Sequence, residues 1–102
     1  MSTERPDFDP AQPYSLAASV TLRPEPFGAL VYDYVTRRLS FLKTPALVTV
    51  VRELEHQPTA GDALTAAAVP ALERDRYLQA LAGLYAAGTI RLRDPAHVGQ
   101  EP

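Results

Sequence analysis

Hydrophobic and polar residues alternate near the start of the chain. Over residues 19–23, Val20 and Leu22 occupy every second position, and this two-residue period is typical of a half-buried strand. Proline follows at position 24. Because proline lacks the amide hydrogen that a strand contributes to its sheet, the pattern predicts that the strand ends there.

Two further segments have the composition of strands. Residues 29–35 are rich in β-branched and aromatic side chains. Residues 38–43, which read RLSFLK, hold apolar side chains between basic ends. Thr36 and Arg37 lie between the two segments and predict a tight turn. Together with the first segment, they predict a three-stranded antiparallel meander.

The period changes to that of a helix after position 44. Residues 45–55 place apolar side chains at helical spacing. Thr44 is suited to cap the first turn with its hydroxyl, and Pro45 fits the first helical position, where no amide hydrogen is needed. A helix over residues 45–55 is therefore predicted.

Two more helices and a short terminal strand follow. Residues 61–68 predict a short helix capped by Thr59, and residues 72–87 predict a longer one with an apolar face. Gly88 is a helix stop of the kind that adopts a left-handed conformation. Residues 90–93 alternate again and predict a last strand or wing.

The order of these elements predicts an α+β fold in which a three-stranded antiparallel N-terminal sheet precedes three helices. The helices have the order of a winged helix-turn-helix core. Residues 1–13 are rich in proline and acids and predict a flexible arm, with Phe8 and Tyr14 as the groups able to pin it to the body. Residues 94–102 predict a disordered tail, so the expected domain spans 14–93.

The chemistry of the chain argues against catalysis. It has no cysteine, which excludes disulfides, thiolate metal sites and cysteine nucleophiles. The two histidines, His56 and His97, lack the spacing of metal ligands. No phosphate-binding loop or nucleophile-elbow motif is present. The sequence predicts that the protein is not an enzyme and carries no cofactor or metal.

Charge separates the body of the chain from its ends. Residues 20–93 carry nine Lys and Arg against seven Asp and Glu, whereas the rest carries one against five. This balance slightly favours an acidic peptide partner and is too weak to indicate nucleic acid. No apolar run reaches the ~20 residues that span a bilayer, and no secretory signal is seen. We expect a cytoplasmic protein that binds neither nucleic acid nor membrane.

DNA binding is the competing function for a winged helix. The third helix would then enter the major groove with Arg74 and Arg76 near its start. Glu73 and Asp75 alternate with these arginines. Because phosphate contacts normally dominate DNA affinity, the small positive surplus makes DNA binding the alternative rather than the leading hypothesis.

Two segments carry a family resemblance. Residues 22–54, which include RPEPFGAL and RRLSFLK, resemble the peptide chaperones of the mycofactocin system. Residues 74–90, which read RDRYLQALAGLYAAGTI, fit the same family. More distantly, the chain is similar to the PqqD-like peptide chaperones, whose winged-helix domain is called a RiPP recognition element. The resemblance covers most of residues 14–93.

The resemblance implies a function and its partners. Members of this family bind the leader of a small ribosomally made precursor peptide and present it to a radical S-adenosylmethionine (SAM) maturase. They carry no cofactor themselves. The implied function is therefore that of a non-catalytic chaperone in mycofactocin biosynthesis.

The family's binding mode also implies a site. The leader adds as a strand to the free edge of the third strand, in the groove between that strand and the third helix. Leu81 and Leu84 on this helix fit the core as well as the groove. The implied peptide-binding residues are Arg38, Leu39, Ser40, Phe41, Leu42 and Lys43 on the strand and Arg74, Tyr77, Leu78, Leu81 and Tyr85 on the helix.

The alternation within the third strand also predicts which side chains face the ligand. Leu39 and Phe41 share a parity, so we expect them to pack on the core. Arg38, Ser40 and Leu42 would then lie on the opposite face.

Overall fold

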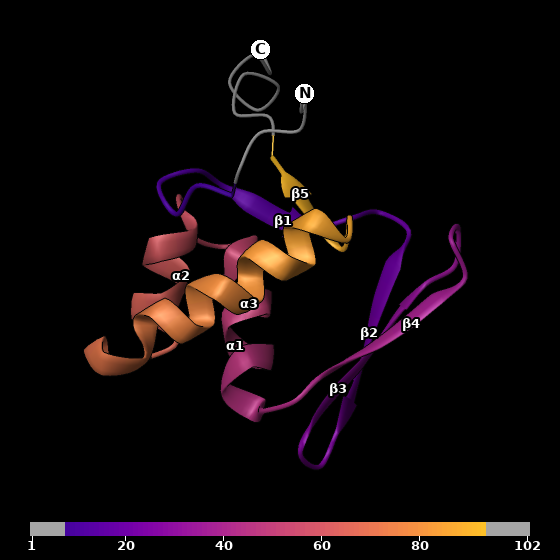
Figure 1. The fold of residues 1–102 in the computed structure, drawn as a ribbon, viewed down its shortest axis with the longest axis horizontal. Helices are drawn as coiled ribbons and strands as arrows, with labels where there is room; N and C mark the ends of the chain where they lie inside the picture. The colour runs from indigo at the N-terminus through magenta and orange to yellow at the C-terminus, as the bar shows by residue number, and fades with distance from the viewer. Residues whose placement is uncertain (1–7, 94–102) are drawn as a thin grey trace.

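The computed structural model describes residues 8–93 and shows an α+β architecture with two antiparallel sheets and three α-helices (Figure 1). The strands are β1 (Tyr14–Leu16), β2 (Val20–Glu25), β3 (Gly28–Asp33), β4 (Arg38–Leu42) and β5 (Ile90–Leu92). β2, β3 and β4 form a meander in that order, which confirms the predicted three-stranded sheet. β1 and β5 form a separate two-stranded sheet.

The predicted helices are present, with small shifts at their ends. They are α1 (Pro45–Leu54), α2 (Ala60–Ala66) and α3 (Arg74–Ala86), the last preceded by the 3₁₀ turn η1 (Ala71–Glu73). The Thr44 hydroxyl accepts a hydrogen bond from the Leu47 N–H (3.1 Å), and the Thr59 hydroxyl accepts one from the Asp62 N–H (3.0 Å). Both predicted caps are thereby confirmed.

Gly88 ends α3 in the predicted way. Its φ of 83° lies in the left-handed region. The Gly88 N–H donates to the Tyr85 carbonyl (3.0 Å) and the Thr89 N–H donates to the Leu84 carbonyl (2.9 Å). This pair of bonds is the Schellman motif, and it turns the chain from α3 directly into β5.

The β1–β5 sheet was predicted only in part. The terminal strand is present, but its partner β1 was missed because three residues are too few to show alternation. Tyr14 pairs with Leu92 and is buried. Its ring stacks on Phe8 with centroids 4.8 Å apart and meets Tyr85 edge-on at 5.4 Å.

Residues 8–13 of the predicted arm lie against the body in this structure. The Ala60 N–H donates to the Gln12 carbonyl (3.0 Å) and the Gly61 N–H donates to the Pro10 carbonyl (2.9 Å). These bonds satisfy two of the amide groups that the start of α2 leaves free. The remainder of the arm, residues 1–7, and the predicted tail, residues 94–102, lie outside the described residues.

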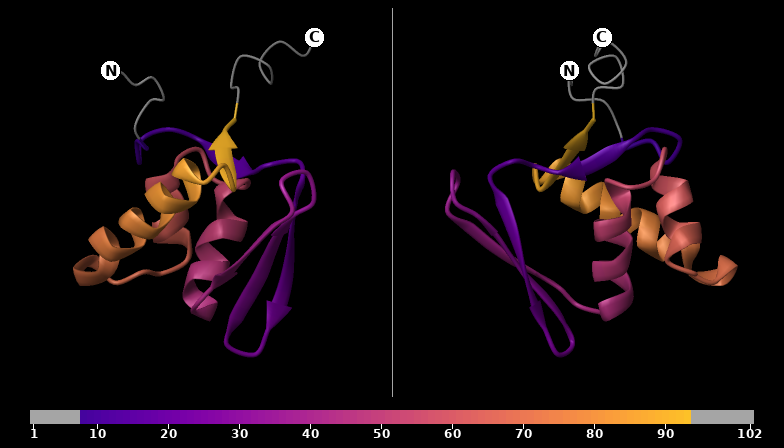
Figure 2. Two further views of the ribbon diagram at one scale, coloured as in Figure 1. Left: turned by 45° about the vertical axis from the view of Figure 1, so that its right-hand side comes forward. Right: turned by 180° about the vertical axis from the view of Figure 1, so that it is seen from behind.

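α1 is the central element of the core. It contacts α2 on one side and β3 and β4 on the other, and Figure 2 shows it between them. Its residues Val50, Val51 and Leu54 are buried. Leu64 of α2 and Leu81 of α3 are fully buried in the same cluster.

Pro24 does not end β2, contrary to the prediction. β2 pairs only with β3 and is therefore an edge strand. The Tyr34 N–H donates to the Ser19 carbonyl (3.0 Å), so the odd-numbered residues of β2 bond to β3. Pro24 is even-numbered and turns its nitrogen away from the sheet, where the missing amide hydrogen costs no ladder bond.

Gly28 begins β3 where two strands approach closely. A Cβ built on this residue would lie 1.9 Å from the carbonyl oxygen of Leu42 and 3.2 Å from Cζ of Phe41. No side chain fits that space, so the meander requires glycine here.

Candidate functional site

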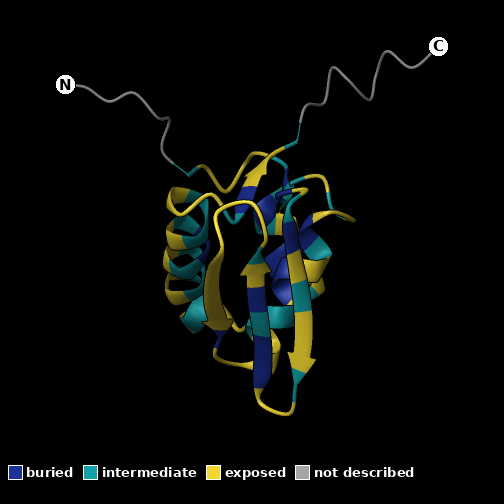
Figure 3. Cartoon of the chain, turned by 90° about the vertical axis from the view of Figure 1, so that its right-hand side faces the viewer, coloured by how far each residue is buried: buried dark blue, intermediate teal, exposed yellow. Residues whose placement is uncertain are grey.

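β4 has a free edge, because in the meander it pairs only with β3 (Figure 3, where β4 is mostly yellow). The Tyr34–Ser19 bond fixes which backbone groups point which way, since successive residues of a strand turn their N–H and carbonyl groups to opposite sides. The even-numbered residues of β3 bond to β2, and its odd-numbered residues bond to β4. Val31 is odd-numbered and lies opposite Ser40. The backbone groups of Ser40 therefore face β3.

The free edge is consequently made by the odd-numbered residues of β4. Leu39 and Phe41 turn their N–H and carbonyl groups away from β3. These are the groups with which an added strand would form its hydrogen bonds.

The side chains of β4 lie on the faces of the sheet opposite to those that were predicted. Leu42 is 2% exposed and packs in the core, whereas Leu39 is 64% and Phe41 39% exposed. The expectation that Leu39 and Phe41 pack on the core is wrong. The even-numbered residues share the inner face with Val31, which is buried on β3 and lies opposite Ser40.

A cleft of about 340 Å³ lies between the meander and the C-terminal end of α3. Its lining residues are Val31, Asp33, Arg38, Leu39, Ser40, Ala87 and Thr89. Three residues of β4 thus lie close to the end of α3. A groove is therefore present between the third strand of the meander and the third helix, the two elements that the resemblance implies.

The predicted residues of α3 do not line this cleft. Arg74 is the first residue of α3, and its guanidinium donates to the Thr65 hydroxyl at 3.5 Å. A 13-residue α-helix is about 20 Å long, so Arg74 lies roughly that far from Ala87. Leu81 is fully buried, while Tyr77 and Leu78 are half-buried and pack against the core.

Tyr85 lines a second cleft, of about 530 Å³, between α3, the β1–β5 sheet and the end of the meander. Asp33 lines both clefts. The structure therefore brings Arg38, Leu39 and Ser40 together with Ala87 and Thr89, and leaves the predicted helical residues elsewhere.

Asp33, Ala87 and Thr89 were missed by sequence reasoning. Gly88 marked the end of the helix, but nothing in the sequence showed that this end faces β4. Asp33 fell within the predicted strand over residues 29–35, although an aspartate before a turn commonly bonds to the backbone that follows it.

Asp33 fixes the turn that leads into β4. Its Oδ1 accepts hydrogen bonds from the Ser19 hydroxyl (2.8 Å) and the Val35 N–H (3.0 Å). The hydrogen bond from the Ser19 hydroxyl is the largest cause of a lowered pKa at Asp33, and the backbone bonds from Thr36 and Val35 lower it further. Together these bonds outweigh desolvation, which raises the pKa. The charged carboxylate therefore holds the hairpin end of the free edge in place.

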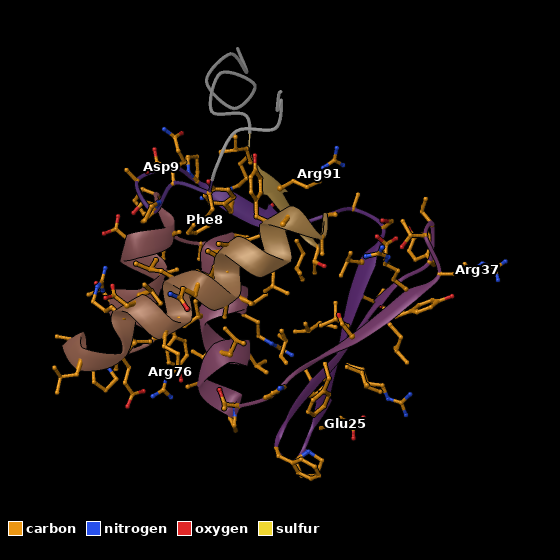
Figure 4. The ribbon with its side chains drawn as sticks, viewed as in Figure 1. Phe8, Asp9, Glu25, Arg37, Arg76 and Arg91 are labelled. Carbon is orange, nitrogen blue, oxygen red and sulfur yellow. The ribbon has the colours of Figure 1, made fainter. Side chains whose placement is uncertain are left out.

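Cations with no carboxylate partner among residues 8–93 flank this edge. Among residues 8–93 a single ion pair is present, between Arg23 and Glu25 at 3.6 Å. In this part of the chain Arg37, Arg38 and Lys43 therefore have no carboxylate partner. Figure 4 shows Arg37 projecting away from the body at the hairpin tip. The edge is therefore suited to a ligand that carries acidic residues.

Residues 8–93 contain no cluster of His, Cys, Asp and Glu arranged to hold a metal ion. In the same part of the chain, no helix is long and apolar enough to cross a membrane.

The fold and the site define a small α+β domain with an open strand edge beside a groove. The chain belongs to the peptide chaperone MftB family, whose sequence model matches residues 13–91. This confirms the resemblance seen in the sequence. The prediction that the protein is not an enzyme agrees with membership in a family of peptide chaperones.

Curated relatives named peptide chaperone MftB support the assignment. The chain is 48% identical over 77 residues to the protein of Mycobacterium ulcerans, which covers 76% of this chain and 71% of the relative. It is 47% identical over 78 residues to that of Mycolicibacterium smegmatis, covering 76% of each chain. The protein of Mycobacterium tuberculosis is 44% identical over 78 residues, covering 76% of this chain and 72% of the relative. No solved structure matches the chain.

Proposed function

We propose that this protein binds the leader of the mycofactocin precursor peptide by strand addition to β4 and presents it to a radical SAM maturase in the cytoplasm. The observation that carries the proposal is the free edge at Leu39 and Phe41, which lies beside the cleft against Ala87 and Thr89. Membership in a family of peptide chaperones supports it. The meander and helices would then form the winged-helix RiPP recognition element implied by the resemblance.

Backbone hydrogen bonds would set the register of the leader. Leu39 and Phe41 each offer one N–H and one carbonyl on the free side. A protein hydrogen bond contributes a net ~0.5–1.5 kcal/mol, so four such bonds give useful affinity with little sequence preference. Specificity must therefore come from side chains.

Side-chain selection has two sources on this edge. Arg38 and Lys43 at its ends would attract acidic leader residues, each exposed pair contributing only ~0–1 kcal/mol. The exposed Leu39 and Phe41 offer larger apolar contacts. On α3, we place the peptide contacts near Ala87 and Thr89, since the buried Leu81 is available only if the core opens.

Titration of the ¹⁵N-labelled protein with the leader of its cognate precursor tests the proposal by NMR. We expect saturable shifts concentrated at residues 38–43 and 87–89. Shifts confined to the start of α3, around Arg74, would move the site to the other end of the helix. Absence of saturable binding to the cognate leader would refute the proposed function.

A further inference from the structure

The outer face of the meander carries exposed apolar side chains from two strands. In the β3–β4 register, Tyr32 lies opposite Leu39 and Leu30 lies opposite Phe41. Tyr32 is 38% exposed, and Leu39 and Phe41 are exposed as well. We call these four residues the outer-face cluster. It lies on the side of the sheet away from α1 and takes no part in the core or in either cleft, apart from Leu39 at the rim of one.

The segments outside the described residues offer little to cover this face. Residues 1–7 read MSTERPD and residues 94–102 read DPAHVGQEP. Met1 and Val98 are their only large apolar residues. An exposed apolar patch of this kind is typical of a surface that contacts another molecule.

The charges around the cluster indicate the chemistry of that molecule. Arg23 lies opposite Leu30 on the same face, and Arg37 and Lys43 stand at the two ends of β4. Glu25 lies on the same face of β2 as Arg23, with its carboxylate 3.6 Å from the Arg23 guanidinium. A second copy of this chain would bring the same cations against one another. A partner with carboxylates around an apolar patch would complement them.

We infer that the outer-face cluster is the docking surface for the folded partner that receives the peptide. This inference rests on the proposed function. A strand added to β4 places every second side chain on the outer face, next to Leu39 and Phe41. The partner would then contact the chaperone and the outward side chains of its peptide in one continuous surface.

The size of the face makes this arrangement dependent on the peptide. Three strands about 4.8 Å apart and five residues long, at ~3.3 Å each, give a face of roughly 14 by 17 Å. This is small beside the ~800 Å² that each partner buries in a stable complex. A fourth strand widens the face by about a third, so the partner should prefer the loaded chaperone.

The inference is tested by calorimetry, in which the radical SAM maturase of the same pathway is titrated into the Tyr32→Glu variant loaded with leader peptide. Tyr32 is on the central strand and has no backbone group at the free edge. We expect at least tenfold weaker binding of the maturase and leader affinity within about twofold of wild type. Tyr32→Thr, which keeps a strand-forming residue, should show the same loss if Tyr32→Glu proves unfolded. Leu72→Glu is the matched control, since Leu72 is 98% exposed on η1 and should leave both affinities unchanged.

Wild-type affinity of leader-loaded Tyr32→Thr for the maturase would overturn the inference, as would a leader-loaded wild-type protein that does not bind the maturase. A wild-type dimer that these variants dissociate, measured by sedimentation, would assign the face to a second copy and also overturn it. Failure of the proposed function looks different. In that case the wild-type protein binds no leader, whatever the maturase does.

Discussion

Ser40 lies directly opposite Val31 across the β3–β4 ladder, with its backbone groups directed into the sheet. This relationship makes neighbouring positions of β4 unequal. Proline at position 40 removes a bond within the sheet, whereas proline at position 39 removes one that only a ligand would use.

Ser40→Pro should therefore lower the free energy of unfolding by about 1–3 kcal/mol. The reason is that the backbone carbonyl of the buried Val31 loses the N–H of residue 40 as its hydrogen-bond donor. Leu39→Pro should melt within a few degrees of wild type and bind the leader at least tenfold more weakly. Circular-dichroism melts and a leader-binding titration measure the two effects. Leu39→Ala keeps the N–H and isolates the contribution of the side chain. Normal leader binding by Leu39→Pro would contradict strand addition to β4.

Gly28→Ala should destabilise the protein by about 1–3 kcal/mol. The new Cβ would meet the backbone oxygen of Leu42, which cannot move without shifting the end of β4. Gly83→Ala is the matched control, because nothing lies within 4 Å of the Cβ at this position in α3. It should be neutral or slightly stabilising. Urea denaturation of both variants gives the comparison, and equal stabilities would mean that the β3–β4 approach is looser than the structure shows.

Asp33 should make stability depend on acid pH. Its pKa in the folded protein is lowered from the ordinary value of 3.8, chiefly by the Ser19 hydroxyl. A depressed carboxyl pKa contributes stability that is present above the unfolded value and is lost as the pH falls through the folded value. Asp33→Asn should thus lower the melting temperature at pH 7, and its difference from wild type should shrink towards pH 2.

Ser19→Ala tests the cause of that pKa shift, because it removes the main hydrogen-bond donor and leaves the carboxylate in place. An NMR titration of the Asp33 side chain should show a higher pKa in this variant. An unchanged pKa would mean that the backbone donors of the turn, rather than Ser19, dominate.

Arg38→Ala and Lys43→Ala should each weaken binding of an acidic leader by at most about fivefold at low salt, since an exposed ion pair contributes ~0–1 kcal/mol. The effect should fade at high salt. Arg76→Ala is the control, because Figure 4 places Arg76 near the start of α3, away from β4. A salt-dependent loss of duplex DNA binding in Arg76→Ala would instead favour the alternative function.

Local patterns in the sequence predicted the elements well, and failed where tertiary contacts decide. The meander, the caps at Thr44 and Thr59 and the stop at Gly88 follow from neighbouring residues alone. The face of β4 that packs on the core does not follow from neighbouring residues, because both faces of this strand contain a leucine. Only the pairing with the buried Val31 selects Leu42 for the core.

The sequence predicted the two elements that border the cleft, but not the residues of α3 that lie beside it. A helical wheel shows which residues share a face, and it carries no information about which end of the helix approaches another element. The Schellman turn at Gly88 leads from α3 into β5, and the residues around this turn, Ala87 and Thr89, line the cleft beside β4, whereas Arg74 does not. The pairing of β1 with β5 was equally out of reach, since it joins residues at opposite ends of the domain.

The β1–β5 sheet has a practical consequence for the engineering of this protein. Because Tyr14 pairs with Leu92, the chain enters and leaves the domain at adjacent points, remote from the tip of the β2–β3 hairpin. A short linker between the two ends should permit circular permutation, with new termini opened at that tip next to Phe27. Such a permutant would tether a maturase or a reporter beside the outer face while the β4 edge stays open.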